Sequence, residues 1–394
     1  MSNITNIDDL VEPTHDEHAR QRFVSVLRKH VTADFAQDMR TVYDDRVAPA
    51  FEKTHGRKPA TGMEIRKAMK NEPIFQEWTA LSYNAQQMTW WSVQPSIERR
   101  LPELVQSAKD AARATPAGGT LRLNPDVVMP KSVSDIDIHL MPGSFAAEHG
   151  ADDVAQGALY HHGTGVFAGG IVHRTKGGWG ATTARYFKLR HPEFVPKTHL
   201  DIGCTVGREL FSVMDVYPQA QTYAVDVGAP VLRYAHARAE AMGKTVHFSQ
   251  QNAETLDFDD ATFDLITTSF FFHEISVPSA RKILREAYRV LKPGGLMINQ
   301  EMPPSSFVKD PYYDFATDTW NELFNNEPHV RNFRQQDLPK LFADAGFAEK
   351  NYVEISVPNY GTWPDALFEA CVRGEAVPPE VENGQAWYSF GAWK

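Results

Sequence analysis

The hydrophobic pattern divides the chain into three stretches. Between residues 18 and 115 apolar positions recur at helical spacing, and the first helical face carries four of them: Phe23, Val26, Leu27 and Val31. From 120 to about 180, short apolar segments alternate with glycines. From 199 to 299, short and almost wholly apolar runs alternate with amphipathic segments of helical length. That alternation is typical of a parallel sheet covered by helices on both faces.

These runs predict the secondary structure. Five strands are expected in close succession: His199–Ile202, Thr222–Asp226, Val246–Phe248, Phe263–Ser269 and Leu296–Asn299. Two further strands are expected at Tyr352–Val357 and Ala366–Val372, and two short ones upstream at Thr120–Leu123 and Asp135–Leu140. Helices are expected at Thr182–Leu189, between the strands, and at Asp337–Ala345, where Gly346 is a helix-ending signal. In the first stretch, Pro95 is expected to start a new helix that ends near Ala114.

Composition narrows the class of protein. With 394 residues the chain has room for one or two domains with a buried core. The net charge of −10 argues against a nucleic-acid partner, which normally requires a basic face. Two cysteines are too few for a disulfide framework and suit a cytoplasmic protein. The acidic, polar start of the sequence and the lack of a run of roughly 18 apolar residues give no sign of a signal peptide or membrane span.

The run from His199 to Arg208 carries the most specific chemistry. A buried strand breaks there into a turn with glycines at 203 and 207, where the backbone can approach a ligand closely, and a helix follows. A dinucleotide fingerprint would need glycines where this chain has Thr205 and Arg208, so that register fails. Asp201, two residues before the first glycine, suits a ligand that carries an ammonium group.

Further landmarks follow the next strands. Asp226 ends the second strand, close to the spacing at which an acid meets a ribose in a βαβ unit. Asn252 and Ala253 follow the third strand, and the fourth delivers the sequence Phe270-Phe-Phe-His-Glu274. Lys292-Pro-Gly-Gly295 then precedes the fifth strand.

In this order and spacing, residues 197–300 resemble the class I S-adenosylmethionine (SAM) methyltransferases, of the type 11/25-like group, and the resemblance extends more loosely to about residue 374. It implies an α/β fold with a Rossmann-like, seven-stranded, mostly parallel sheet, the seventh strand being antiparallel, beside a mainly helical N-terminal domain. It implies SAM as cofactor and S-adenosylhomocysteine as product. The implied cofactor-binding residues are Asp201, Gly203, Cys204, Gly207, Asp226, Val227, Asn252, Ala253 and Ser269. Asn252 stands where the family usually has Asp, and an amide carbonyl can still accept a hydrogen bond from an adenine amine. A Rossmann-like domain that binds a different nucleotide, or none, is the alternative.

Catalysis by methyl transfer needs mainly positioning and exclusion of water, and a base only where the acceptor arrives protonated. His273 and Glu274 are the candidates for that base. They are equally open to a structural interpretation, in which they stabilise the start of the following helix. His162 is a third, weaker candidate.

A second group of polar and aromatic residues lies upstream of the first strand. Tyr160, His161, His162, His173, Arg174 and Trp179, with His139, invite a metal interpretation, but their spacing matches no metal signature and no acid pair accompanies them, so no metal is expected. Closure over cofactor and acceptor is favoured, with a surface linker as the alternative. The expected acceptor-binding residues are Tyr160, His161, Trp179, Phe270, Tyr312, Tyr313 and Trp320.

We therefore expect a helical N-terminal domain at 1–115, a glycine-rich linker or cap at 116–180, and a SAM-binding domain at 181–374 with an acceptor lid at 303–333. An aromatic tail at 375–394 is expected to dock on the protein. The predicted function is methylation of a small molecule at oxygen, nitrogen, carbon or sulfur, and a homodimer is a plausible assembly. Non-methyl SAM chemistry, methylation of protein or RNA, and a non-catalytic SAM-binding scaffold are the alternatives.

Overall fold

The computed structural model describes residues 5–168, 178–359, 363–384 and 386–394. Its centre is a sheet of eight strands in the order β1-β4-β3-β2-β5-β6-β8-β7. The strands are β1 (Thr120–Arg122), β2 (Thr198–Ile202), β3 (Gln221–Asp226), β4 (Val246–Gln250), β5 (Phe263–Ser269), β6 (Leu291–Glu301), β7 (Tyr352–Pro358) and β8 (Ala386–Trp393). Strand β8 is antiparallel to both of its neighbours, and the other pairings are parallel. The expected Rossmann-like, mostly parallel α/β sheet is confirmed.

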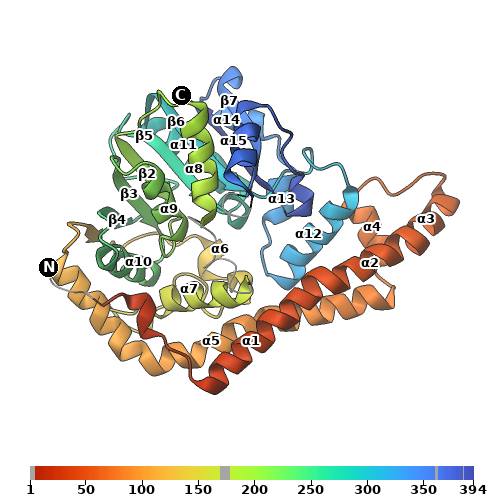
Figure 1. Ribbon diagram of the computed structural model, residues 1–394, viewed down its shortest axis with the longest axis horizontal. Coiled ribbons are helices and arrows are strands. Elements are labelled where there is room, and N and C mark those ends of the chain that lie inside the picture. The colour runs from red at the N-terminus through yellow and green to blue at the C-terminus, as the bar shows by residue number, and fades with distance from the viewer. Residues whose placement is uncertain (1–4, 169–177, 360–362, 385) are drawn as a thin grey trace.

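Helices cover both faces of the sheet (Figure 1). On one face, α8 (Gly178–Arg190), α9 (Arg208–Val216) and α10 (Ala229–Ala241) pack against the strands. On the other face lie α11 (Val277–Val290), α13 (Val330–Arg334) and α14 (Leu338–Ala345). Gly346 ends α14 in the left-handed conformation, as its position predicts.

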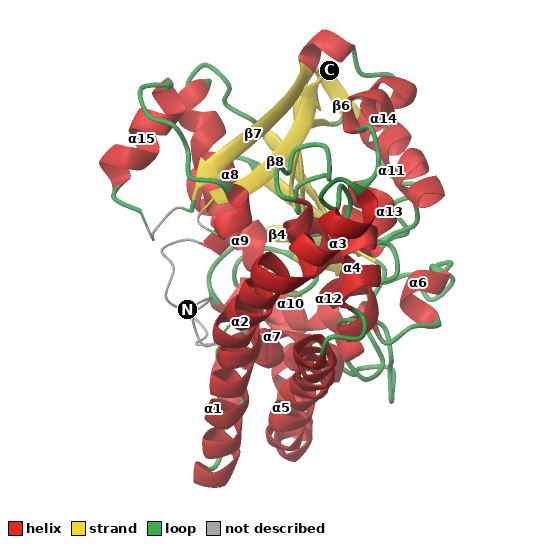
Figure 2. Cartoon of the chain, turned by 90° about the vertical axis from the view of Figure 1, so that its right-hand side faces the viewer, coloured by secondary structure: helices red, strands yellow, loops and turns green. Residues whose placement is uncertain are grey.

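The N-terminal helices form an elongated layer beneath the carboxyl ends of the strands (Figures 1 and 2). They are α1 (His15–Lys29), α2 (Ala36–Val42), α3 (Ala48–His55), α4 (Gly62–Met69) and α5 (Pro73–Ala114), followed by α6 (Lys131–Ser134) and α7 (Ala155–Phe167). The outer side of α10 packs on α5 and α7, so the helical layer and the sheet domain share one hydrophobic core. Helix α12 (Pro311–Phe324), from the segment after β6, packs on α4 and α5. Within the described parts of the chain, no helix combines the length and apolar character needed to cross a membrane.

Two C-terminal predictions are wrong. The segment expected as the seventh strand forms helix α15 (Asp365–Arg373), because Phe368, Cys371 and Val372 recur at helical spacing and are buried together on one side. The antiparallel strand is instead the aromatic tail, which forms β8 between β6 and β7. Strand β1 adds to the far edge of the sheet, so the sheet has eight strands and not the expected seven.

Three upstream predictions also differ from the structure. Asp135–Leu140 forms no strand, and α7 occupies much of the stretch expected to contain short strands. Helix α5 runs through Pro95 without a break. Phe23 and Val26 are 59 % and 67 % exposed, whereas the buried side of α1 carries Val24 and Arg28. The other two predicted positions do face the core, since Val31 is 1 % exposed and Leu27 packs against the same cluster. The face is therefore only partly predicted, because it also contains a buried arginine, bonded to Gln86 and Thr89 of α5.

Candidate functional site

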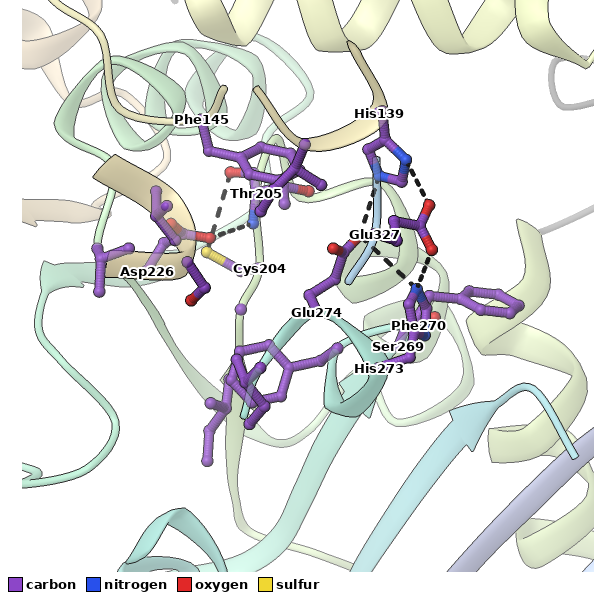
Figure 3. Close-up of a pocket in the computed structure, with 18 of the residues that line it drawn as sticks. His139, Phe145, Cys204, Thr205, Asp226, Ser269, Phe270, His273, Glu274 and Glu327 are labelled. Carbon is purple, nitrogen blue, oxygen red and sulfur yellow. Dashed lines mark hydrogen bonds and ion pairs between the residues drawn. The ribbon is translucent and has the colours of Figure 1, made fainter. Parts of the chain in front are cut away.

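A cavity of about 350 Å³ lies at the carboxyl ends of β2, β3, β4 and β5. This is the edge at which open α/β sheets bind ligands. The sheet supplies one wall, and α5, α7, α12 and the loop before Phe145 supply the opposite one. Figure 3 shows two polar groups in it, one around Asp226 and Thr205 and the other around His139, Glu274 and Glu327.

The glycine turn after β2 shapes the first end of the cavity. Gly203 and Gly207 have φ angles of +74° and +76°, in the left-handed region that favours glycine. A Cβ atom on Gly203 would lie 2.4 Å from the ring of Phe271, and one on Gly207 would lie 2.6 Å from the ring of Phe211. Gly203 lines the cavity, whereas Gly207 caps the start of α9 behind it.

Asp201 is a buried carboxyl group facing this end. Its Oδ1 accepts a hydrogen bond of 2.6 Å from the hydroxyl of Thr267. Burial raises the pKa of Asp201 to about 7, and the charges of Glu209 and Asp226 act in the same direction. A carboxylate with unused lone pairs in such a place fits a cationic ligand group.

Asp226 ends β3 and is bound by two backbone amides. Thr205 N donates to its Oδ2 and Gly228 N to its Oδ1, each at 2.9 Å. Burial raises the pKa of Asp226, while these hydrogen bonds act against the rise. A carboxylate offers about four acceptor positions, so two remain for ligand hydroxyls, and the residue fits a ribose.

Asn252 borders the same end, but its side chain is already engaged. Its Nδ2 donates to the carbonyl of Val128 at 3.0 Å, and its Oδ1 accepts from Glu254 N at 2.9 Å. The amide therefore holds the loop before α6 against the loop after β4, a contact that the sequence does not reveal.

The second polar group is centred on His139. Its Nε2 lies 3.0 Å from Oε1 of Glu274, and its Nδ1 lies 2.7 Å from Oε1 of Glu327. The His139 backbone is left-handed, with φ of 59°, and its carbonyl accepts hydrogen bonds from Gln86 Nε2 and Trp90 Nε1 of α5. Burial opposes protonation of His139, yet the two carboxylates raise its pKa well above the usual value.

His273 completes this group. Its Nδ1 lies 2.5 Å from Oε1 of Glu301, and its Nε2 lies 3.6 Å from both Glu274 Oε1 and Glu327 Oε2. Burial acts to raise the pKa of Glu274, but the imidazoles of His139 and His273 outweigh it and lower this pKa to about 2. Burial and the charge of Glu274 raise the pKa of Glu327. We call His139, His273, Glu274, Glu301 and Glu327 the His–Glu cluster.

The structure brings most of the predicted site residues to this cavity. The lining includes Asp201, Gly203, Cys204, Asp226, Val227, Asn252, Ala253, Ser269, His273, Glu274, Tyr160, Phe270 and Trp320. Besides Gly207, four predicted residues do not line it: His161 and His162, on α7, and Tyr312 and Tyr313, on α12. His162 Nε2 instead lies 3.5 Å from the hydroxyl of Tyr234, and Tyr312 packs against Tyr43 in the core of the helical layer. His173, Arg174 and the side chain of Trp179 lie outside the described residues.

Sequence reasoning missed several lining residues, among them Trp90, Phe145, Phe167, Met302 and Glu327. The sequence could have revealed Glu301 as a site residue, since it is an acid at the end of a strand, as Asp226 is. No sequence pattern identifies Glu327, because its partner His139 is far away in the sequence.

Comparison with known proteins finds similarity to methyltransferases. A methyltransferase domain model matches residues 200–295. The demethylmenaquinone methyltransferase of Thermus thermophilus is 36% identical over 28% of this chain and 50% of its own length. The ubiquinone/menaquinone biosynthesis C-methyltransferase UbiE of Brucella anthropi is 31% identical over 39% of this chain and 65% of its own. The chain thus spans between half and about two thirds of the length of these relatives.

Two solved structures are also similar. A candidate O-methyltransferase from Nostoc punctiforme is 14% identical, with 93% of this chain and 98% of that chain covered and a TM-score of 0.45. Phosphoethanolamine N-methyltransferase 2 of Haemonchus contortus, solved with phosphomonomethylethanolamine and S-adenosylhomocysteine, is 17% identical over 56% of this chain and 53% of that chain, with a TM-score of 0.39. The sheet, the turn after β2 and the matched domain define a Rossmann-like methyltransferase domain. Residues 200–295 thus form a methyltransferase domain, and the chain is similar to SAM-dependent methyltransferases of the UbiE type.

Proposed function

We propose that this protein transfers a methyl group from SAM to a small-molecule acceptor inside the cavity. The observation that carries the proposal is the arrangement of two polar ends in one cavity. At one end are Asp201, the glycine turn and Asp226; at the other is the His–Glu cluster. A cofactor and an acceptor need such adjoining places if one methyl group is to pass between them.

The first end fits SAM. Asp201 would hold the ammonium group of its methionine part, the turn at Gly203 would lie against that part, and Asp226 would accept hydrogen bonds from the ribose hydroxyls. The adenine would lie against Asn252 and Ala253, with the Asn252 side chain already bound to its own loop. When bound, SAM supplies a methyl group on a positively charged sulfur, which a nucleophilic atom can displace.

The second end suits an acceptor with a flat apolar body and a polar group. Aromatic side chains that line the cavity include Trp90, Phe145, Tyr160, Phe167, Phe270 and Trp320. They would hold the body of the acceptor and keep water away. His273 and Glu274 would bind its polar group and take up a proton if the acceptor atom carries one. The naming of the relatives for menaquinone and ubiquinone biosynthesis supports a quinol-like acceptor.

Binding and turnover test this proposal separately. Calorimetry should give saturable binding of SAM and S-adenosylhomocysteine, with NADH and NADPH as controls that do not bind. Incubation with methyl-labelled SAM and a panel of phenols, quinols, amines and thiols should then label an acceptor. Binding of nicotinamide cofactors alone would overturn the cofactor assignment. Binding of SAM without label transfer to any small molecule would favour a scaffold or non-methyl chemistry.

Four further points are proposals. The segment at 303–333 would act as a lid, because Trp320, Asn321, Asn325 and Glu327 reach the cavity from it. The sheet domain would take in residues beyond 181–374, since β1 and β8 belong to the sheet.

A homodimer is supported by the exposed apolar side chains of Phe23, Val26 and Trp91 on α1 and α5. A cytoplasmic location is supported by the free thiols of Cys204 and Cys371.

A further inference from the structure

The His–Glu cluster contains more metal-binding groups than a general base requires. One ligand atom each from His139, Glu274 and Glu327 lie within 4.8 Å of one another. His273 is not a member of that group, but its Nε2 lies 3.6 Å from a carboxylate oxygen of each glutamate and could supply a fourth donor. These residues come from three separate parts of the chain, yet all four side chains converge at one end of the cavity (Figure 3).

We propose that His139, His273, Glu274 and Glu327 form a binding site for a divalent first-row transition metal ion. Two imidazole nitrogens and two carboxylate oxygens form a mixed donor set that suits zinc, iron(II), cobalt(II) or manganese(II). Magnesium and calcium prefer oxygen ligands only, and copper(I) prefers sulfur.

Unused acceptor atoms support a cation at this place. Glu327 is 2 % exposed, and its Oε2 accepts no hydrogen bond from the described residues. Oε2 of Glu274 is likewise buried without a hydrogen bond from the described residues. Leaving a buried carboxylate oxygen without a hydrogen bond is costly, and a bound cation removes that cost.

Surrounding contacts orient the ligands as in metal centres. Glu301 lies 2.5 Å from Nδ1 of His273, which directs the Nε2 atom of the same ring towards Glu274 and Glu327. A carboxylate behind a ligating histidine is the usual arrangement in metal sites. Gln86 and Trp90 fix the backbone of His139 from α5 in the same way. The three carboxylates also outnumber the two imidazoles, so the cluster favours a positive charge.

The site would serve the proposed function at its acceptor end. An ion held here borders the same cavity as Phe270 and Trp320, where the acceptor would lie. This part of the inference depends on the proposed function, and it favours acceptors that present an oxygen atom. Metal binding itself does not depend on it.

Metal titration tests the site directly. Protein stripped with a chelator is titrated with cobalt(II), followed by its visible absorption, and with zinc(II) by calorimetry. We expect one metal per chain and a cobalt spectrum typical of nitrogen and oxygen ligands. His139→Ala and Glu327→Gln should weaken binding at least about tenfold, and Glu301→Gln should weaken it by about 10- to 100-fold.

His191→Ala is the matched control, because His191 and Glu193 form a partly exposed histidine–glutamate pair outside the cavity, with 3.5 Å between Nδ1 and Oε1. Its metal affinity should equal that of the wild type. SAM affinity and thermal unfolding of each variant show whether it is folded. Binding of no metal, or equal binding by wild type, His139→Ala and Glu327→Gln, overturns the site. SAM binding and methyl transfer by metal-free protein would leave the proposed function standing in either case.

Discussion

The carboxylate of Asp226 ties the end of β3 to the glycine turn after β2. Its Oδ2 accepts the hydrogen bond of Thr205 N at 2.9 Å, and Thr205 itself is held in a left-handed conformation with φ of 45°. Two neighbouring strand ends are thus connected by one side chain. Any ligand that bonds to Asp226 is also positioned against the turn.

Asp226→Ala is expected to weaken SAM binding by about 1–3 kcal/mol, because ligand hydroxyls would lose a buried acceptor. The same substitution leaves the amides of Thr205 and Gly228 without their partner. Calorimetric titration with SAM measures the loss.

Asp226→Asn separates the two effects, since its amide oxygen can still accept from one backbone amide. It should recover part of the stability lost in Asp226→Ala but little of the affinity. Unchanged SAM affinity in both variants would show that Asp226 does not hold the ribose.

The pH dependence of SAM affinity should report the state of Asp201. Its pKa is raised to about 7 by burial, so below that pH the free protein carries a neutral carboxyl group. Binding an ammonium group requires the carboxylate, so binding releases a proton below pH 7. Affinity should therefore rise with pH by up to about tenfold per pH unit and level off near neutrality.

Calorimetry in buffers of different ionisation enthalpy measures the released proton. Asp201→Asn has no such proton, and its weaker affinity should be flat across the same pH range. A wild-type affinity that is equally flat would place the ammonium group elsewhere.

Gly203→Ala is expected to distort the turn and displace the ring of Phe271. The new Cβ would lie 2.4 Å from that ring, at a φ of +74° that side chains rarely adopt. Strain of this kind costs about 1–3 kcal/mol. Thermal unfolding and SAM titration should both show a loss.

Gly118→Ala is the control, because Gly118 has a φ of +76° and a Cβ atom added to it would have no neighbour within 4 Å. It should cost some stability through strain but leave SAM affinity unchanged. Equal effects of the two variants would mean that the contact with Phe271 is unimportant.

Much of the sheet follows directly from the sequence, because buried parallel strands are continuous apolar runs and each helix between them has its own end signals. The C-terminal strands are harder. Ala366–Val372 is a short apolar run that can be read as a strand, although Phe368, Cys371 and Val372 recur at helical spacing, and packing of this side against α8 and β7 favours α15. Whether the aromatic tail docks or joins the sheet depends on β6 and β7 leaving a gap for β8.

The residues of the site likewise fall into two groups, those that the sequence predicts and those that it does not. The residues near β2, β3 and β4 follow strand ends at regular spacing, so a local pattern finds them. The His–Glu cluster joins His139, Glu274 and Glu327, which are far apart in the chain, and no local spacing encodes their contact. Asn252 shows the converse: its position is predictable, but its engagement with Val128 is not.

Arg334 should be the strongest single determinant of how the segment at 303–333 is held. Its side chain is fully buried, and it donates hydrogen bonds to Asp314 at 2.5 Å, to Asp318 and, at 2.9 Å, to the carbonyl of Pro303. Arg334→Ala would leave Asp314 without this arginine and Asp318 with Arg331 alone, and a broken buried ion pair costs about 3–5 kcal/mol. Chemical denaturation should measure a loss of stability of that size, and acceptor binding should be weaker as well.

Lys340→Ala is the control, because it removes an exposed ion pair with Asp344 and should cost no more than about 0.5 kcal/mol. Similar losses in the two variants would show that burial of the arginine does not stabilise this segment.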